Sequence, residues 1–244
     1  MSLPRVLSPR IPVVFECNNY LIVNKPADVY SQPPDKHNLS NRANPRILMD
    51  ELRQQYGTEI TQEWRPVHRL DHGVTGAMLV ATNKNSAIMF SRYLQQGGSK
   101  GFPFVRRYVA ITETGRATPL LGGTGIIDAM GMVTKYKCID DTCFVIELVT
   151  GRKHQIRKHL GIVAKQPILN DTKYGAARTS VNSSQICLHS AFVHTQIGMQ
   201  KRSHIVQLDP SQISQTSPWP SRYLDDHGNL NQQILEALEA PWTD

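Results

Sequence analysis

A sharp polar turn that runs directly into an apolar stretch is the strongest constraint that this sequence places on its fold. The turn, His68–Gly76, holds a single carboxylate, Asp71, and leads into the apolar residues Ala77–Ala81. Glycine adopts backbone conformations that other residues resist, and the two glycines of this turn let the chain bend tightly before a strand. The pattern predicts a rigid loop that presents Asp71 at the entrance to a buried strand.

Hydrophobic periodicity and turn residues predict an α/β (α+β) chain that is rich in strands. Hairpin turns at Asn18-Asn19 and Asp140–Thr142 indicate antiparallel pairing, so we expect a mixed, mostly antiparallel sheet. Asn44 followed by Pro45 is typical of a helix start, and Gly97-Gly98 is typical of a helix end. The expected strands are residues 13–15, 20–23, 79–81, 105–112, 133–139, 143–149, 188–195 and 204–208, and the expected helices are 45–56, 86–96, 154–163 and 234–238.

Positive charge is concentrated in one part of the chain. The formal net charge is +7, and residues 150–178 contain seven lysines and arginines but a single acid, Asp171. A solvent-facing helix would more usually mix acids with bases at i,i+4 spacing. The segment therefore predicts a surface that faces phosphates, and the charge balance favours a polyanionic partner such as nucleic acid.

The spacing of cysteines and histidines argues against a metal site. His68 and His72 are four residues apart, but no third ligand accompanies them across the glycine turn. The cysteines lack the close pairs of a zinc site and are expected to be free thiols: Cys17, Cys138, Cys143 and Cys187.

The sequence contains neither a membrane span nor a clear targeting segment. Its apolar stretches are too short to cross a bilayer, so we expect no membrane partner. The first fifteen residues carry Arg5 and Arg10 and no acid, as a mitochondrial presequence would, but the prolines there oppose an amphipathic helix. We expect a cytoplasmic protein and leave a mitochondrial location open.

Five further blocks accompany the turn, and their order along the chain is specific. They are Asn24–Ala27, Arg106–Ala110, Gly151–Leu160, Asp171–Gly175 and Leu188–Ser190. Together with His68–Asp71, these blocks resemble the ordered motifs of RluA-type pseudouridine synthases. The chain departs from the family pattern at Asp28, where glycine is usual, and at Val74, Thr75 and Lys153.

The resemblance implies a fold and a division of the chain. It implies the pseudouridine synthase fold, a long mixed sheet with flanking helices around a basic cleft. Residues 13–210 would form the catalytic domain, residues 1–12 an N-terminal extension, and residues 211–244 a C-terminal extension that packs on the same domain. We expect this unit to act as a monomer.

The resemblance also implies an activity, the isomerisation of specific uridines to pseudouridine in structured RNA, either ribosomal or transfer RNA. Asp71 would be the catalytic carboxylate, Arg157 its cationic partner, and Tyr108 the aromatic wall on which the target base stacks. Extruding a base from its stack costs a few kcal/mol, and the planar Arg69 side chain would fill the vacated space. Leu188 would supply an apolar surface opposite Tyr108. No cofactor and no metal are implied.

The cations of the basic segment are the expected RNA contacts, chiefly Arg152, Lys153 and Lys158. One alternative is a non-catalytic RNA-binding protein on the same fold, which would have lost Asp71 or its partners; all are present. A second is a hydrolase that pairs Asp71 with His68, but the sequence shows no oxyanion arrangement to support it.

Overall fold

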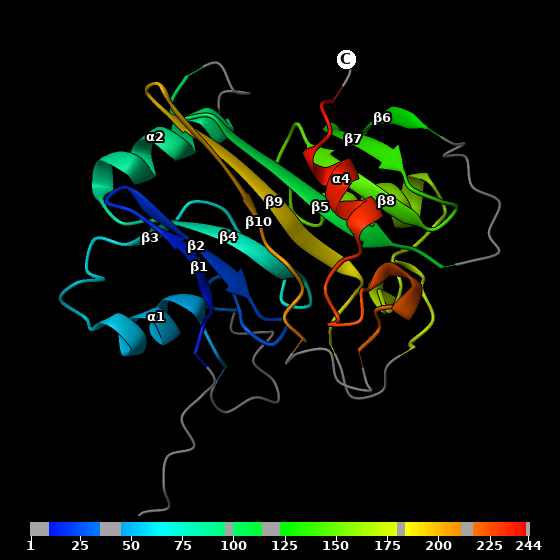
Figure 1. Ribbon diagram of the computed structural model, residues 1–244, viewed down its shortest axis with the longest axis horizontal. Helices are drawn as coiled ribbons and strands as arrows, with labels where there is room; N and C mark the ends of the chain where they lie inside the picture. The colour runs from blue at the N-terminus through cyan, green and yellow to red at the C-terminus, as the bar shows by residue number, and fades with distance from the viewer. Residues whose placement is uncertain are drawn as a thin grey trace, which may run out of the picture.

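A long twisted sheet organises the molecule and brings distant parts of the chain side by side (Figure 1). The computed structural model describes residues 10–34, 45–95, 100–113, 123–179, 184–210 and 217–242. Within these segments the strands are β1 (Val13–Glu16), β2 (Tyr20–Lys25), β3 (Arg65–Pro66), β4 (Thr75–Ala81), β5 (Phe104–Ile111), β6 (Thr124–Ala129), β7 (Met132–Cys138), β8 (Cys143–Leu148), β9 (Leu188–Ile197) and β10 (Gln200–Ile205).

The strand order confirms the predicted mixed, mostly antiparallel sheet. The order is β1-β2-β4-β9-β5-β8-β7-β6, with β3 beside β4 and β10 beside β9. Among the described strands only β4 and β9 pair in parallel; the other pairs are antiparallel. The single parallel junction therefore lies in the middle of the sheet, where the two strands start.

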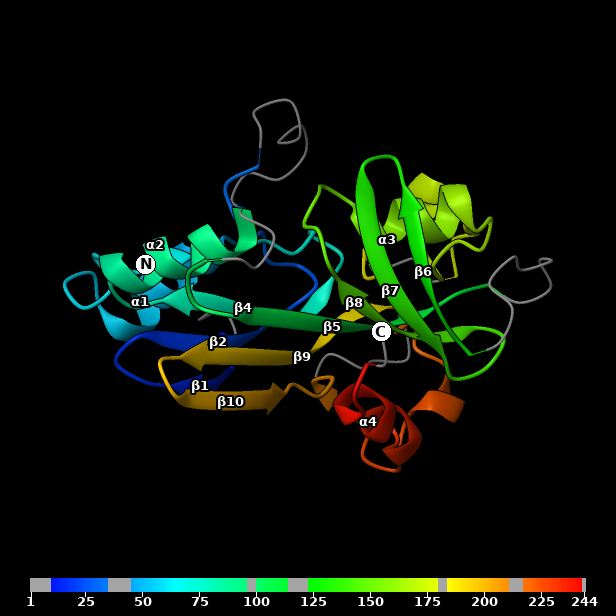
Figure 2. The ribbon, with the colours of Figure 1, turned by 90° about the horizontal axis from the view of Figure 1, so that it is seen from above.

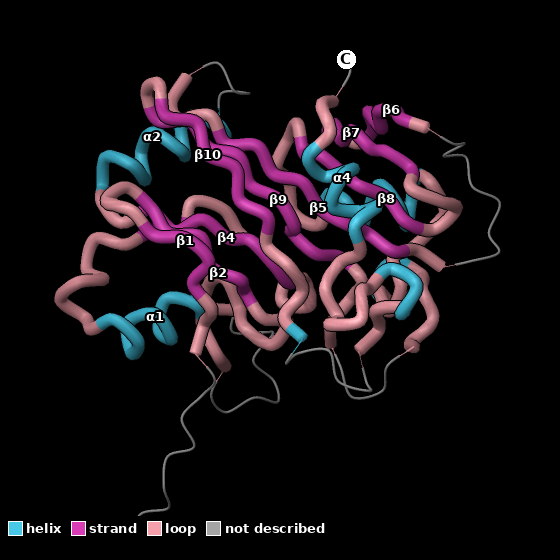
Figure 3. The backbone as a smooth tube through the Cα atoms, viewed as in Figure 1, coloured by secondary structure: helices cyan, strands magenta, loops and turns pink. Residues whose placement is uncertain are grey.

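Helices cover both faces of this sheet. Figure 2 shows α1 and α2 on one side and α4 on the other, and Figure 3 shows the strands running through the middle of the molecule. No helix in the described segments is long and apolar enough to cross a membrane. The helices are α1 (Leu48–Tyr56), α2 (Lys84–Gln95), α3 (Gln155–Lys158), η2 (His159–Val163), η3 (Thr172–Tyr174), η5 (Ser221–Tyr223) and α4 (Gln232–Glu239).

Most predicted elements are present, and the differences have local causes. The prediction that the first helix starts at Pro45 was wrong: α1 begins at Leu48, after Ile47 in an extended conformation that bridges to Tyr30. Asn44 and Gly97-Gly98 lie outside the described residues. The strand expected at 204–208 was also wrong, because β9 continues to Ile197 and β10 follows at once after a tight turn. The strands β3 and β6 were not predicted.

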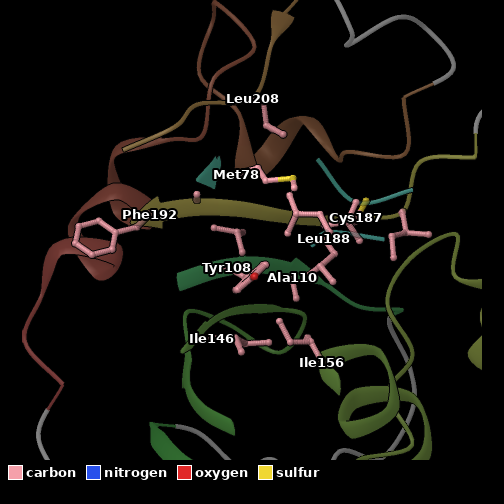
Figure 4. Close-up of a cluster of buried hydrophobic side chains, with 14 of the residues drawn as sticks. Met78, Tyr108, Ala110, Ile146, Ile156, Cys187, Leu188, Phe192 and Leu208 are labelled. Atoms are coloured by element: carbon pink, nitrogen blue, oxygen red, sulfur yellow. The ribbon is translucent and has the colours of Figure 1, made fainter. Parts of the chain in front are cut away.

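Two apolar clusters share β4, which is buried along its whole length. Its residues Ala77 and Leu79 pack into the cluster around Phe90, and Met78 and Val80 pack into the larger one. This two-sided burial explains why the strand reads as a continuous apolar run rather than an alternating one. The larger cluster includes side chains from several strands, among them Tyr108, Leu188 and Ile156 (Figure 4).

The parallel junction is held by a short polar chain. Thr75 and Gly76 of β4 lie opposite His189 and Ser190 of β9. Burial lowers the pKa of His189 to about 4, so its ring is neutral. Its Nε2 lies 2.8 Å from the Val206 carbonyl oxygen and can only donate there, so Nδ1 accepts from the Thr75 hydroxyl at 2.7 Å. The end of the polar turn is thereby fixed to β9.

We predict that Gly76→Ala destabilises the fold by about 2 kcal/mol or more. Gly76 has φ +108, and a Cβ at this position would clash with the Ser190 carbonyl oxygen. Gly131→Ala is the matched control, because Gly131 also has a positive φ, +67, but has no atom within 4 Å of its Cβ position. It should cost only about 1 kcal/mol. Urea unfolding of both variants measures the difference, and equal costs would contradict the close approach of β4 and β9.

Candidate active site

The loop between β3 and β4 holds Asp71 through contacts made by its neighbours. Ser31 Oγ donates to the Leu70 carbonyl at 2.7 Å and accepts from the Leu70 amide at 3.0 Å. The Gly73 carbonyl accepts from the Ile186 amide at 3.0 Å, and a Cβ at Gly73 would clash with the Ser184 carbonyl. These contacts hold the backbone on both sides of Asp71, so the predicted rigid loop is present.

Lys25, at the end of β2, also contacts the loop that carries Asp71. Its side chain is fully buried, and Nζ donates to the carbonyls of Pro26 at 2.6 Å, Val29 at 2.8 Å and His72 at 3.4 Å. Burial lowers the pKa of Lys25 to about 7, although the charges of Asp28 and Asp71 favour the protonated form. The lysine therefore joins the Asn24–Ala27 block to the turn that carries Asp71.

Arg157 of α3 lies between two carboxylates. Its Nη1 donates to Asp71 at 2.8 Å, while Nε and Nη2 donate to the two oxygens of Asp171 at 2.7 and 2.8 Å. Asp171 is only 1% exposed, and the Arg157 guanidinium also lies 5.0 Å from the Tyr174 ring centre. Burial acts to lower the pKa of Arg157, but Asp171 and then Asp71 raise it above its usual value. The guanidinium therefore stays charged. It binds Asp171 through two donor groups and holds Asp71 through the third.

His154 is the second side chain that faces Asp71. Its Nε2 lies 3.5 Å from Asp71 Oδ1, and its Nδ1 lies 2.8 Å from the Tyr174 hydroxyl. Burial lowers the pKa of His154; the charge of Asp71 opposes this, and Arg157 adds to it. At neutral pH the ring is therefore neutral, and it adds little charge to the site.

Sequence reasoning missed the positions of Asp171 and His154. It paired Arg157 with Asp71 alone and interpreted His154 as a structural or RNA-facing residue rather than a catalytic one. Spacing could not have placed His154: it precedes α3 in a left-handed conformation with φ +58, so it does not share a helix face with Arg157. Asp171 lay within a recognised block, but nothing in the sequence indicates that its carboxylate turns toward Arg157.

Asp71 lines a cleft of about 560 Å³ and also a smaller pocket that shares several residues with this cleft. Tyr108 of β5 lines both, and Leu188 of β9 lines the smaller pocket together with Arg157. Both side chains are largely buried, and each presents an edge to the pocket. Burial raises the pKa of Tyr108, so its hydroxyl remains protonated at neutral pH.

The predicted cationic residues divide between the cleft and its surroundings. Arg69 and Arg152 are exposed and line both the cleft and the smaller pocket, and Lys153 lines the cleft. Lys158 is partly buried on α3 and is not among the residues that line either one. The structure therefore brings Asp71, Tyr108, Arg157, Leu188, Arg69, Arg152 and Lys153 together and leaves Lys158 outside.

His68 does not act with Asp71. Its Nε2 accepts a hydrogen bond from the Leu79 amide at 3.0 Å, which fixes the ring against β4. Burial, with a contribution from Arg106, lowers its pKa well below the usual value. Within the described segments, no cluster of three or more His, Cys, Asp or Glu side chains could hold a metal ion. The arrangement suits a reaction of one fixed carboxylate on a planar group stacked against Tyr108.

Comparison with known proteins identifies the family of the chain. The family model for RNA pseudouridylate synthase matches residues 19–161, which include both Asp71 and Arg157. The chain is 37% identical to the 21S rRNA pseudouridine(2819) synthase of Saccharomyces cerevisiae, over 97% of this chain and 98% of the relative. It is 38% identical to the enzyme of the same name from Eremothecium gossypii, over 93% of this chain and 87% of that one.

Solved structures show the same fold at low sequence identity. Human RNA Pseudouridylate Synthase Domain Containing 1 superposes over 100% of both chains with a TM-score of 0.59 and 19% identity. Human RNA Pseudouridylate Synthase Domain Containing 4 covers 83% of this chain and 90% of its own, with a TM-score of 0.59 and 17% identity.

We predict that Asp171→Asn lowers the free energy of unfolding by about 3 kcal/mol, because it leaves the Arg157 guanidinium short of a buried counterion. Asp50→Asn is the matched control. Asp50 pairs with Arg53 at 2.7 Å, but the two side chains are 53% and 44% exposed. Its loss should change stability by about 0.5 kcal/mol or less. Chemical denaturation measures both; a small effect of Asp171→Asn would show that the clamp contributes little to folding.

Proposed function

The chain belongs to the RNA pseudouridylate synthase family, and we propose that Asp71 is the carboxylate with which it isomerises uridine in a large-subunit ribosomal RNA. The enzyme is an RNA pseudouridine synthase, an isomerase. The assignment of Asp71 is supported by one observation above all, its contact with the fixed Arg157 in the smaller pocket, beside the basic cleft that Asp71 also lines. No other carboxylate lines the cleft or the smaller pocket among the described residues.

The reaction needs a carboxylate that remains ionised away from water. The bond from C1′ to N1 of the uracil breaks, the base turns, and a bond from C1′ to C5 forms. C5 then loses its proton and N1 gains one, so the product is an isomer of uridine. Asp71 would assist the cleavage by attack on the sugar or the ring. Arg157 donates a charge-assisted hydrogen bond to Asp71 at 2.8 Å, which fixes the orientation of the carboxylate. Tyr108 would stack on the turning base. It lines the same smaller pocket as Asp71, so its protonated hydroxyl could take part in proton transfer.

The remaining residues of the site would hold the RNA. Leu188 offers an apolar surface to the smaller pocket, which Arg157 also lines. Arg69 is exposed and lines the same pocket as Asp71. Among the described residues it makes no ion pair, only a 3.5 Å hydrogen bond to Gln32, so its planar side chain can fill the space left by the extruded base. Arg152 and Lys153 would contact phosphates along the cleft, and Lys158 would contact RNA only beyond its rim.

The names of the relatives favour one RNA over another. Both fungal relatives are named for 21S rRNA, so we infer that this enzyme modifies a large-subunit ribosomal RNA in mitochondria rather than a transfer RNA. The enzyme would act as a monomer, because a single chain supplies all three residues of the proposed site, Asp71, Arg157 and Tyr108.

We predict that Asp71→Asn abolishes pseudouridine formation, by about 1,000-fold or more in rate, while fold and RNA affinity stay near those of the unchanged protein. The amide keeps the shape of the side chain but not its charge. Pseudouridine mapping of total RNA should show one or more sites lost from the mitochondrial large-subunit RNA when the gene is deleted. The unchanged gene and an Asp50→Asn control should restore them, and Asp71→Asn should not. If Asp71→Asn restored the lost pseudouridines, Asp71 would not be the catalytic residue. If the lost site lay in a transfer RNA, the substrate would be a transfer RNA instead.

A further inference from the structure

Two adjacent arginines of β5 differ sharply in their surroundings. Arg107 Nε donates to Glu147 at 2.8 Å, and its Nη1 donates to the Leu238 and Ala240 carbonyls. Arg106 is only 6% exposed, yet it makes no hydrogen bond or ion pair within the described structure. Its one defined contact is with the Phe104 ring, whose centre lies 5.6 Å from the guanidinium carbon. A buried guanidinium without a counterion is unfavourable and unusual.

The Arg106 side chain faces the cleft that holds Asp71. Alternate residues of a strand share one face, so Arg106 and Tyr108 lie on the same side of β5, and both line this cleft. The Nε atom is enclosed and has no partner. A Cβ at Gly151 would lie 3.5 Å from both Nη1 and Nη2, so glycine at this position keeps the two ends of the guanidinium approachable.

The charges around Arg106 leave it available to an anion from outside. Arg69, Arg152 and Lys153 line the same cleft, and among the described residues its only acid is Asp71, which Arg157 already engages. His68, which also lines the cleft, is neutral because burial and the charge of Arg106 lower its pKa. No described group in the cleft therefore neutralises Arg106.

We propose that Arg106 binds a backbone phosphate that flanks the target uridine, through its two Nη groups. Residues two apart on a strand are about 7 Å apart, so a phosphate on Arg106 would belong to the nucleotide stacked on Tyr108 or to its immediate neighbour. The contact fixes the sugar over Asp71 while the base turns. This inference rests on the proposed function, because it takes RNA as the ligand of the cleft.

The test is a thermodynamic cycle between the arginine and single phosphates. The probe is a synthetic RNA that spans the mapped uridine, made with one uncharged methylphosphonate at a time within three nucleotides of that uridine. Arg106→Met keeps the apolar stem on Phe104 and removes the charge. It should weaken binding of the unmodified RNA by about 10- to 100-fold. One of the methylphosphonate RNAs should bind the unchanged protein more weakly by a similar factor. The Arg106→Met variant should bind that RNA as tightly as it binds the unmodified RNA.

Two further variants separate binding from packing. Gly151→Ala keeps every charge but narrows the approach to the guanidinium, so it should weaken RNA binding with little loss of stability. Arg106→Met should melt at the same temperature as the unchanged protein or higher, because it removes a buried unpaired charge. Arg53→Met, on the exposed face of α1, should alter neither affinity nor methylphosphonate sensitivity.

Affinity is measured rather than turnover, so the result does not depend on whether Asp71 is catalytic. If Arg106→Met and each methylphosphonate weaken binding independently, so that their fold-losses of affinity multiply, Arg106 contacts no phosphate near the target. If Arg106→Met lowers the melting temperature and leaves affinity unchanged, the arginine is structural. Either outcome overturns the inference, whereas failure of the unchanged protein to modify its RNA would count against the proposed function alone.

Discussion

The site depends on a single guanidinium held by two carboxylates. Asp171 takes two of the Arg157 donor groups and is almost fully buried, so the orientation of the arginine is set before any substrate arrives. The third donor then determines where Asp71 lies. The three residues come from α3, from the segment before η3 and from the loop before β4, so this one cluster joins three separate parts of the chain. It also supplies the charge that a carboxylate needs in a largely buried pocket.

The sheet explains why this cluster can form at its centre. β4 and β9 pair in parallel over a short stretch where both strands start, and the loop that precedes β4 therefore opens beside the start of β9 and the face of β5. Tyr108, Leu188 and Asp71 meet there, although they are far apart in sequence. The close approach of Gly76 to Ser190 and the hydrogen bonds of His189 keep the junction fixed. The rigidity of the core is thus transmitted directly to the loop that carries Asp71.

The sequence allowed much of this to be predicted, and the limits have physical causes. The turn around Asp71, the antiparallel hairpins and the pairing of Asp71 with Arg157 are local or motif-borne features. The two-residue strand β3 carries too few residues for periodicity to detect, and β6 has exposed residues where a strand signal needs buried ones. The role of Asp171 depends on how the segment after η2 folds back, which no local pattern encodes. Arg106 was visible as part of a block, but only its missing partners single it out.

The central claim is that Arg157, oriented by Asp171, holds Asp71 in its reactive position, and the single-turnover rate at saturating RNA tests it most directly. Arg157→Met removes the contact with Asp71 at similar bulk. The rate at saturating RNA should fall by about 100-fold or more, with RNA affinity little changed, when the variant is assayed at a temperature where it remains folded. Arg157→Lys, which keeps the charge but not the planar geometry, should also be slow. A rate at saturating RNA that stays unchanged while RNA affinity falls would contradict the account and make Arg157 a phosphate contact.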